Sequence, residues 1–497
     1  MLQSIISRTH TAVVMWDISG NIKNLASAVL EILLSHSGVV LLIGAVTVTV
    51  YKSVRKQHAP PGPPRLPFLG NILQVPRQFQ SIPFLDWSTK YGPIFSLNLL
   101  GQNIIVLNNF KTANDLLERR SNIYNSRPHL IMLQDILCGG SFPPLEGDAD
   151  IWRRWRRASH ETFGTKGVEK YQAVQSKAAA LAALRIATHP SGWEHTIEVT
   201  VYGWPPLEED SPAIELVFKL AERVSNAAVP GAFLVDIFPL MKFLPAWMAR
   251  WKREGEEFHN QMSAVLEKYL SDANEQMVSG DAQTCYVSEF IQTEDRHGFS
   301  RKTSAWISAV MLAAGAETTS STMTNFLLAM LNYPGVMRKA QAELDEVVGR
   351  GRVPTFADMD NLPYIRAIVR ETLRWRPVSP IGLPHVATED NWYEGYFIPK
   401  GTAVDPSIYP DFDVYRPERF LDESGKVEIS PSDVRQSGHA TFGFGRRICV
   451  GMHFADQALF IAIATILWAF DINPPVDENG DVVIPPTDQL VDAGTVV

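Results

Sequence analysis

The first long apolar stretch of the chain covers residues 32–51 and holds no Asp, Glu, Lys or Arg. As a helix it is long enough to cross a bilayer core, which takes roughly 20 residues. Lys52, Arg55 and Lys56 follow it, and basic residues beside a spanning helix favour the cytosolic side. We therefore predict a luminal segment over 1–31, a transmembrane helix over 32–51 and a cytosolic body. A signal peptide and a buried globular helix are the alternatives.

Prolines crowd positions 60–64, so residues 52–65 are predicted to form a basic, stiff hinge. In the body, residues 66–497, an apolar β-rich stretch from Ile94 to Val106 predicts a hairpin. Short β-like pieces at Ile381–His385 and Tyr396–Val404 interrupt the C-terminal third. Helical spacing of apolar residues recurs at Trp152–Phe163, Ala213–Asn226, Trp251–Ser271, Ser304–Asn332, Pro334–Val348, Pro363–Trp375 and Gly451–Phe470. The pattern predicts one large, mainly α domain with a small β-rich lobe.

The stretch Pro230–Met248 is rich in large apolar side chains and also carries three prolines. Two interpretations stay open. The side chains pack in an ordinary core, or they form a surface that dips into the headgroup region of a membrane.

Composition narrows the choice of partners. The chain has 497 residues, a net charge of −9, 45% hydrophobic and 20% charged residues, so a sizeable core is possible and no basic field indicates nucleic-acid binding.

Its three cysteines, Cys138, Cys285 and Cys449, lie far apart. Such sparse cysteines argue against a disulfide framework and for a reducing compartment. A free cysteine is more often an inert small hydrophobe than a ligand, and we interpret Cys138 and Cys285 that way.

Glu317 is the only charged residue between Thr303 and Met337. A helix that is apolar almost all round is buried or membrane-spanning, and the serine and threonine content favours a buried helix. Residues 314–319 read Ala-Gly-Ala-Glu-Thr-Thr, where the glycine costs about 1 kcal/mol against alanine and the threonine hydroxyls can bend the helix. The functional interpretation is a groove in which Thr318 and Glu317 relay protons to a bound diatomic ligand. The alternative is a kinked core helix.

Glu371 and Arg374 lie three positions apart and share one face of a predicted helix. Most such pairs are solvated and contribute roughly 0.3–0.5 kcal/mol. Arg419 lies in a Pro-Glu-Arg-Phe run further along the chain and could complete a buried Glu–Arg–Arg cluster. The forked guanidinium group suits that task better than a lysine would.

Cys449 stands in the sequence Phe-Gly-Phe-Gly-Arg-Arg-Ile-Cys-Val-Gly, residues 442–451. The glycines let the backbone turn tightly and approach a flat ligand. Arg446 and Arg447 bring positive charge, which favours the thiolate form of the cysteine, and an arginine can also grip a carboxylate. A long apolar helix follows, so its partly positive N-terminus lies near the sulfur. The run predicts a ligand-binding thiolate.

In this order along the chain, these motifs resemble those of the cytochrome P-450 family of haem-thiolate monooxygenases. The anchor and hinge come first, followed by Trp-Arg-Arg-Trp-Arg at 152–156, the 314–319 run, Glu371-x-x-Arg374 and the Pro-Glu-Arg-Phe run. The cysteine loop fits the family pattern F-x-x-G-x-R-x-C-x-G at every defined position. The details most resemble basidiomycete members of secondary metabolism. The resemblance implies the cytochrome P-450 fold for residues 66–497.

The resemblance also implies haem b as cofactor, with Cys449 as axial ligand of the iron and Phe442 on the sulfur side of the ring. The residues implied to hold the haem propionates are Trp152, Arg156, His385 and Arg447. Those implied to manage protons at bound oxygen are Thr318 and Glu317. Those implied to be structural are Glu371, Arg374 and Arg419.

The implied function is oxidation of a hydrophobic secondary metabolite, with a terpenoid first and an aromatic or polyketide skeleton second. Electrons would come from NADPH through a cytochrome P-450 reductase, at the endoplasmic reticulum membrane, with the catalytic domain in the cytosol. In the family the substrate pocket is lined by Ile131–Leu145, Pro230–Met248, the central helix and Ile381–Leu383. The alternatives are a haem-thiolate isomerase or dehydratase that uses no reductase, and a haem-binding protein made inactive by internal deletions.

Three segments depart from the family pattern. The chain is shorter than its relatives after Trp193, where a helix is reduced, and after Val404, where a strand and turn are completed. It also stops at Val497, where relatives continue into a C-terminal β-hairpin. All the named motifs remain intact.

Overall fold

The structure is a computed structural model that describes residues 58–76, 79–188, 212–229, 231–279, 286–406, 414–427, 439–477 and 479–487. The chain divides into two compact units: the smaller contains Trp392–Ile398 with the residues up to Pro60, and the larger contains Pro61–Asn391 and Pro399–Val497. The predicted luminal segment, the transmembrane helix and residues 52–57 of the hinge lie outside the described residues.

In the small unit, strands β4 (Asn391–Tyr393) and β5 (Tyr396–Ile398) form a two-stranded sheet. The turn between them holds Glu394 and Gly395, both with positive φ, at 48° and 83°. Two central residues with positive φ suit the right-handed twist of a tight hairpin.

In the large unit, four strands form one sheet in the order β1-β2-β6-β3. Strands β1 (Ile94–Leu99) and β2 (Gln102–Leu107) pair antiparallel and confirm the predicted hairpin. Strand β6 (Ala403–Pro406) lies parallel to β2 and antiparallel to β3 (His385–Val386). Relative to the family pattern the chain is shorter after Val404, and in the structure strand β6 continues past that point through Pro406.

The two other predicted β pieces are confirmed only in part. In Ile381–His385 only His385 joins a strand, because Pro384 and Pro380 cannot donate to a ladder. The piece Tyr396–Val404 is two strands in different sheets, β5 and β6. Gly401 interrupts it with a φ of 81°, which only glycine adopts at little cost.

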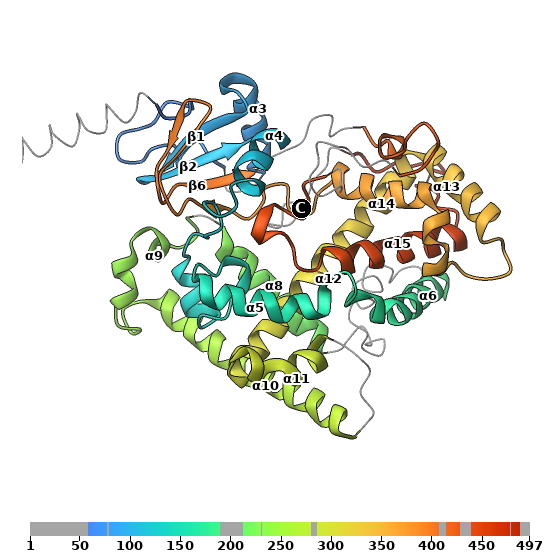
Figure 1. Ribbon diagram of the computed structural model, residues 1–497, viewed down its shortest axis with the longest axis horizontal. Helices are drawn as coiled ribbons and strands as arrows, with labels where there is room; N and C mark the ends of the chain where they lie inside the picture. The colour runs from blue at the N-terminus through green and yellow to red at the C-terminus, as the bar shows by residue number, and fades with distance from the viewer. Residues whose placement is uncertain are drawn as a thin grey trace, which may run out of the picture. The chain divides into compact units, whose positions relative to one another are not determined.

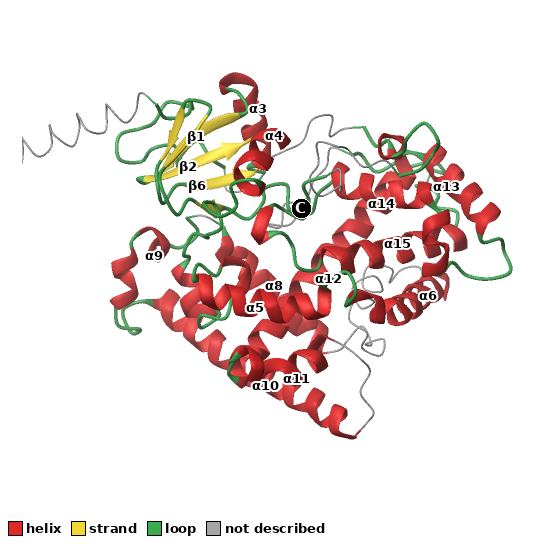
Figure 2. Cartoon of the chain, in the orientation of Figure 1, coloured by secondary structure: helices red, strands yellow, loops and turns green. Residues whose placement is uncertain are grey.

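Helices make up most of the large unit (Figures 1 and 2). The α-helices are α3 Ser81–Tyr91, α4 Phe110–Ala113, α5 Ala149–Phe163, α6 Gln172–Thr188, α8 Pro212–Ala228, α9 Leu234–Ile237, α10 Arg250–Ser279, α11 Tyr286–His297, α12 Arg301–Asn332, α13 Pro334–Val347, α14 Pro363–Trp375 and α15 Met452–Ala469. The π-helical and 3₁₀ turns are η2 Asn114–Glu118, η3 Ile131–Leu137, η4 Pro143–Leu145, η5 Val168–Tyr171, η8 Pro239–Phe243, η9 Phe356–Asn361, η10 Pro417–Phe420 and η11 Gly445–Arg447. All seven predicted helices are confirmed, and the mainly α class with them.

Five α-helices of the described chain were not predicted: α3, α6 and α11, and the four-residue helices α4 and α9. In α6 the cause is composition, since alanines lie on every side of the helix and leave no apolar stripe to detect. Alanine is nevertheless the strongest helix former, so the segment folds as a helix.

Helix α12 contacts α8, α10, α11, α13, α14 and α15, which confirms that it is a buried helix. Its start is fixed by Ser300, whose side chain accepts a hydrogen bond from the Thr303 N–H. Deeper in, the Trp306 ring is fully buried and its Nε1 donates to the Ser263 hydroxyl of α10 at 2.9 Å. These contacts hold the helix that carries the Ala-Gly-Ala-Glu-Thr-Thr run in a fixed position.

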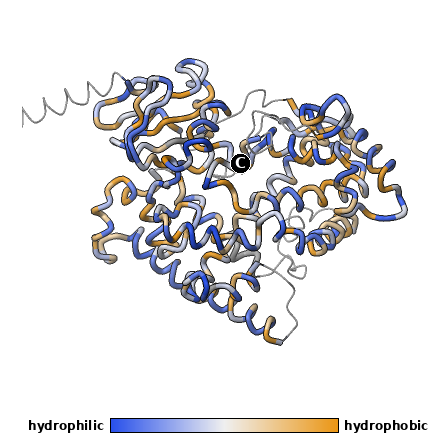
Figure 3. Tube along the Cα trace, in the orientation of Figure 1, coloured by the Kyte–Doolittle hydropathy of each residue, from blue (hydrophilic) through white to orange (hydrophobic). Residues whose placement is uncertain are grey.

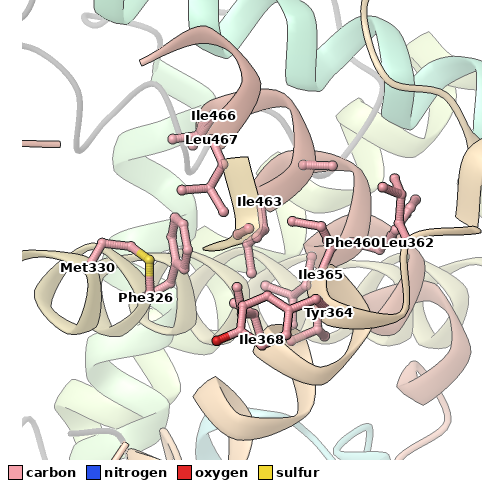
Figure 4. Packing of buried hydrophobic residues seen from close by; sticks show 14 of the residues in the cluster. Phe326, Met330, Leu362, Tyr364, Ile365, Ile368, Phe460, Ile463, Ile466 and Leu467 are labelled. Carbon is pink, nitrogen blue, oxygen red and sulfur yellow. The ribbon is translucent and has the colours of Figure 1, made fainter. Parts of the chain in front are cut away.

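The main core lies where α12, α13, α14 and α15 meet (Figure 4). Phe326 and Met330 of α12 pack there with Ile365 and Ile368 of α14 and Ile463 of α15, all fully buried. Within the described residues one helix, α15, is long and apolar enough to cross a membrane. Its burial in this core explains its apolar character without a bilayer.

The stretch Pro230–Met248, which contains α9 and η8, has some apolar side chains packed in the protein and others exposed. Val235 is buried, and Met241 packs against the neighbouring core. Leu240, Phe243 and Trp247, in contrast, are 82%, 80% and 77% exposed. Figure 3 colours each residue along the chain by hydropathy, and apolar positions are frequent in this stretch. One side of it therefore anchors in the protein and the other offers an apolar surface.

Candidate functional site

A cavity of about 400 Å³ lies in the large unit. Helix α12 forms one wall with Ala314, Gly315 and Thr318, and the cysteine loop forms another with Phe442 and Cys449. The volume is within the range of ligand and cofactor sites. Of the predicted pocket segments, η4 and the chain before His385 reach this cavity, whereas the described residues of α9 and η8 do not line it.

The cysteine loop is shaped by two glycines. Gly443 and Gly445 have φ values of 73° and 62°, a region in which other residues are strained. The loop closes on itself, because the Cys449 N–H donates to the Phe442 carbonyl at 2.9 Å and the Ile448 N–H to the Gly445 carbonyl at 3.2 Å. Cys449 is thereby held at the start of α15.

The Cys449 thiol is open to the cavity, which itself lies deep in the protein. Burial raises the pKa of this thiol, while the N–H groups of Gly451 and Met452 and the charge of Arg156 act to lower it. The helix terminus thus contributes as the sequence predicts. The arginine that acts on the sulfur is Arg156 of α5, and not the predicted neighbours Arg446 and Arg447.

Three arginines line the cavity: Arg127, Arg156 and Arg447. Burial lowers the pKa of Arg127 to about 9 and that of Arg447 to about 10, and it lowers the pKa of Arg156 as well. Each donates to backbone carbonyls: Arg156 to Ile448 at 2.5 Å, for example. Within the described part of the chain none of the three forms an ion pair with a carboxylate, and the Nε of Arg127 and one Nη of Arg447 are buried without a partner.

Two aromatic side chains complete this end of the cavity. The guanidinium of Arg447 stacks over the Trp152 ring at 4.3 Å from its centroid, held by bonds to the Asn125 and Glu146 carbonyls. His385 is buried, and its Nδ1 lies 2.6 Å from the Tyr124 carbonyl, which suits an N–H donor at that atom.

The structure thus gathers Trp152, Arg156, His385 and Arg447 around one cavity and adds Arg127, which sequence reasoning missed. A buried charge without a partner is costly unless a ligand neutralises it. Three cations and an apolar chamber therefore fit a flat apolar molecule with carboxylates at one edge. Haem b, with its two propionates, has that chemistry, and the Cys449 thiol can supply a ligand to its iron.

On α12 the Thr318 hydroxyl lines the cavity and donates to the Ala314 carbonyl at 2.7 Å. One turn later the Thr322 hydroxyl donates to the Thr318 carbonyl at 2.8 Å. Such back-bonding loosens the ordinary ladder of the helix and favours a local groove. Glu317 is half-buried on the same turn, but it is not among the described residues that line the cavity.

Glu371 is fully buried and collects four donors. Arg374 donates to it from Nε at 2.7 Å and from Nη2 at 2.9 Å, Arg419 from Nε at 3.1 Å, and the Arg416 N–H at 2.6 Å. Both arginines also donate to the Val414 carbonyl. The predicted Glu–Arg–Arg cluster therefore exists, and it joins α14 to the segment around η10.

The other cysteines need no functional interpretation from this geometry. Cys138 is buried, and burial raises the pKa of its thiol, which keeps it protonated. Cys285 lies outside the described residues.

Comparison with known proteins supports the same conclusion. The cytochrome P450 family model matches residues 60–190 and 195–491. Cytochrome P450 monooxygenase 58 of Postia placenta is 45% identical over 92% of this chain and 90% of its own. A cytochrome P450 monooxygenase of Armillaria gallica is 42% identical over 88% of each chain. Cytochrome P450 monooxygenase iboC of Amanita muscaria is 34% identical over 88% of this chain and 89% of its own.

Proposed function

This chain belongs to the cytochrome P450 family of monooxygenases, whose cofactor is haem, and on that premise we propose that Cys449 is the axial ligand of the haem iron. The observation that carries the proposal is the pairing of this thiol with the unneutralised Arg127, Arg156 and Arg447 around one cavity. When bound, the thiolate-ligated haem supplies the activation of O₂ that lets one oxygen atom enter a C–H bond.

The residues of the chain have separate tasks in this proposal. Arg127, Arg156 and Arg447 hold the propionates, Trp152 supports Arg447 by stacking, and Phe442 covers the sulfur side. The Thr318 hydroxyl, which donates to the Ala314 carbonyl, would be the group that supplies a proton into the cavity. Glu317, on the same turn of α12, would resupply that proton through water.

We propose a hydrophobic substrate, with a terpenoid as the first candidate. Support comes from the apolar side chains that line the cavity, among them Val310, Met311, Leu373, Val378 and Leu383. Such walls bind apolar skeletons by burial, while the three arginines of the cavity are assigned to the haem propionates.

We also propose attachment to the endoplasmic reticulum membrane, with electrons delivered from NADPH through a reductase. The exposed Leu240, Phe243 and Trp247 support a membrane surface, since aromatic and aliphatic side chains of this kind insert into the headgroup boundary. The apolar stretch over residues 32–51 supports an anchor.

The test of iron ligation is the spectrum of the reduced, CO-bound protein. Haem-supplied wild type is expected to show the band of thiolate ligation, and Cys449→Ala is expected to abolish it. Cys138→Ala is the matched control, because that thiol is buried away from the cavity lining and its loss should leave the band in place. A wild-type protein without the band would overturn the proposal.

The test of the reaction is NADPH consumption with reductase and candidate terpenes. Thr318→Ala is expected to uncouple NADPH use from product, whereas Thr324→Ala on the same helix, whose hydroxyl bonds the Ser320 carbonyl, should not. Product formed without NADPH would favour the isomerase or dehydratase alternative. Haem binding without turnover of any kind would favour an inactive haem-binding protein.

A further inference from the structure

The segment formed by α4 and η2 lies directly against the cysteine loop, although more than 300 residues of sequence separate them. The Gly445 N–H donates to the Glu118 carboxylate at 2.7 Å. Beside it the Phe110 and Phe444 rings meet, with centroids 5.8 Å apart, and Phe444 is buried. The loop is therefore fastened by one polar and one apolar contact.

The approach between the two segments is as close as backbone allows. A Cβ added to Gly445 would lie 2.1 Å from the Leu117 carbonyl oxygen and 2.8 Å from the Ser121 Cβ. The φ of Gly445, 62°, excludes most other residues as well. Glycine at this position therefore serves the contact with η2 as well as the turn of the loop.

The local structure of η2 explains how Glu118 reaches the loop. Asn109 caps α4 by accepting from the Thr112 N–H, which fixes where the helix starts. The turn then widens, and the Arg119 N–H bonds the Asn114 carbonyl, five residues back. Leu116 and Leu117 are fully buried in this wider turn. Single π-helical turns of this kind are rare and frequently mark functional sites.

The bond from Gly445 to Glu118 acts on the geometry of the thiol. The Gly445 carbonyl accepts from the Ile448 N–H, and the Cys449 N–H donates to the Phe442 carbonyl. Both bonds belong to the turn that Glu118 holds from outside. A hydrogen bond to a carboxylate is roughly twice as strong as a neutral one, so this contact restrains the turn strongly, alongside the bonds that Arg156 and Arg447 make.

We propose that Glu118 is a positioning residue for the iron ligand: by accepting from Gly445 it holds the η11 turn and so keeps the Cys449 sulfur in reach of the haem iron. The proposal rests on ligation of the iron by Cys449. It assigns a task to a residue far from the cysteine motif in sequence, on a segment that does not line the cavity in the described structure.

Two substitutions at Glu118 distinguish the effect of side-chain length from the effect of negative charge. Glu118→Gln keeps the length and an acceptor oxygen but loses the charge, whereas Glu118→Asp keeps the charge but is one methylene too short. Gln is expected to fall between wild type and Glu118→Ala, because it keeps a neutral acceptor in place, and Asp is expected to behave like Glu118→Ala, because it cannot reach the Gly445 N–H. The readouts are the rate at which the thiolate CO band of the reduced protein converts to the thiol form, and the rate of haem transfer to an apomyoglobin trap.

Both rates are expected to rise roughly tenfold in the Asp and Ala variants, in line with loss of one hydrogen bond to a charged group. Asp115→Asn is the matched control, since its carboxylate lies on the same turn and is bound by Lys111 and Arg119. It should leave both rates unchanged.

The outcomes are distinct. Wild-type rates in Asp and Ala variants with an intact thiolate band would overturn the role of Glu118 and leave the iron ligand standing. A Gln variant as fast as the Ala variant would also overturn it, because a neutral acceptor in the same place would then be without effect. Absence of the band in wild type itself would instead remove Cys449 as ligand, and this proposal with it.

Discussion

Two groups of arginines are buried or half-buried in the large unit, and they differ in what neutralises them. In the first, which we term the Glu371 cluster, Arg374 and Arg419 share the fully buried Glu371 carboxylate. In the second, the cavity arginines Arg127, Arg156 and Arg447, no carboxylate of the described chain forms an ion pair with any member, and buried nitrogens of two members have no partner.

The difference separates a structural role from a ligand-binding role. A buried pair that the chain completes by itself serves the fold, because removing either member exposes the other to a full desolvation penalty. Buried cations that the chain leaves incomplete cost folding free energy and gain it back only when an anion binds. The same residue type thus serves two purposes, and the presence or absence of a carboxylate tells them apart.

The largest expected effect is at Glu371. Glu371→Gln keeps the shape but leaves two guanidinium groups facing a neutral amide, and breaking a buried pair costs about 3–5 kcal/mol. We expect the variant to unfold at a much lower denaturant concentration than wild type and to accumulate poorly in cells. Chemical unfolding of the haem-free protein measures the effect. Glu254→Gln is the control, because its pair with Arg250 is exposed. Equal midpoints in the two variants would contradict the structural role.

Replacing a cavity arginine is expected to have the opposite effect: the haem-free protein keeps its folding stability, and the haem dissociates faster. Arg127→Met removes an unneutralised charge along with hydrogen bonds to the Leu383 and Pro384 carbonyls. We therefore expect the unfolding free energy of the haem-free protein to stay within about 1 kcal/mol of wild type. Haem should dissociate at least tenfold faster, because one anchor of a propionate is lost.

Haem transfer to an apomyoglobin trap measures the second effect, alongside unfolding of the haem-free variant. Arg119→Met, on an exposed side chain paired with Asp115, is the control for loss of charge alone. If Arg127→Met loses much folding stability but keeps its haem, Arg127 has a structural role like that of Arg374 and Arg419, and the difference between the two groups of arginines is wrong.

Much of this arrangement was predictable from the sequence, and the reasons are local. The helices with an apolar stripe were found because the stripe is a property of neighbouring residues, as in α14 and α5. Helix α6 was missed because its alanines leave no stripe, and β3 was misjudged because pairing partners decide short strands. The Glu371 cluster was predicted in part from spacing alone.

The site shows the same limit more sharply. Cys449 and Arg447 stand in one short motif that can be read along the chain. Arg127 cannot be found that way, since it bonds the Leu383 carbonyl 256 positions away. Glu118, 327 positions from Gly445, is a similar case. Neither residue carries a signal in its own neighbourhood, and only the fold gives each its role.

Asp456 of α15 is an intermediate between the two groups. Burial raises the pKa of this carboxyl to about 7, although Arg370 and Arg366 act to lower it. Since an unfolded aspartate ionises near pH 4, the folded chain holds an extra proton between about pH 4 and 7. Stability from this group is therefore full below pH 4, falls as pH rises to about 7, and is constant above.

Asp456→Asn removes that dependence. We expect the variant to unfold at a higher denaturant concentration than wild type at pH 8 and to match it near pH 4.5, as measured by unfolding of the haem-free protein across that range. Asp358 offers a control of opposite sign, because its bonds from Arg352 lower its pKa to about 2. Asp358→Asn should therefore lose stability at pH 8. An unchanged slope in Asp456→Asn would mean that Arg366 and Arg370 neutralise the carboxylate fully, and Asp456 would then belong with Glu371 as a completed pair.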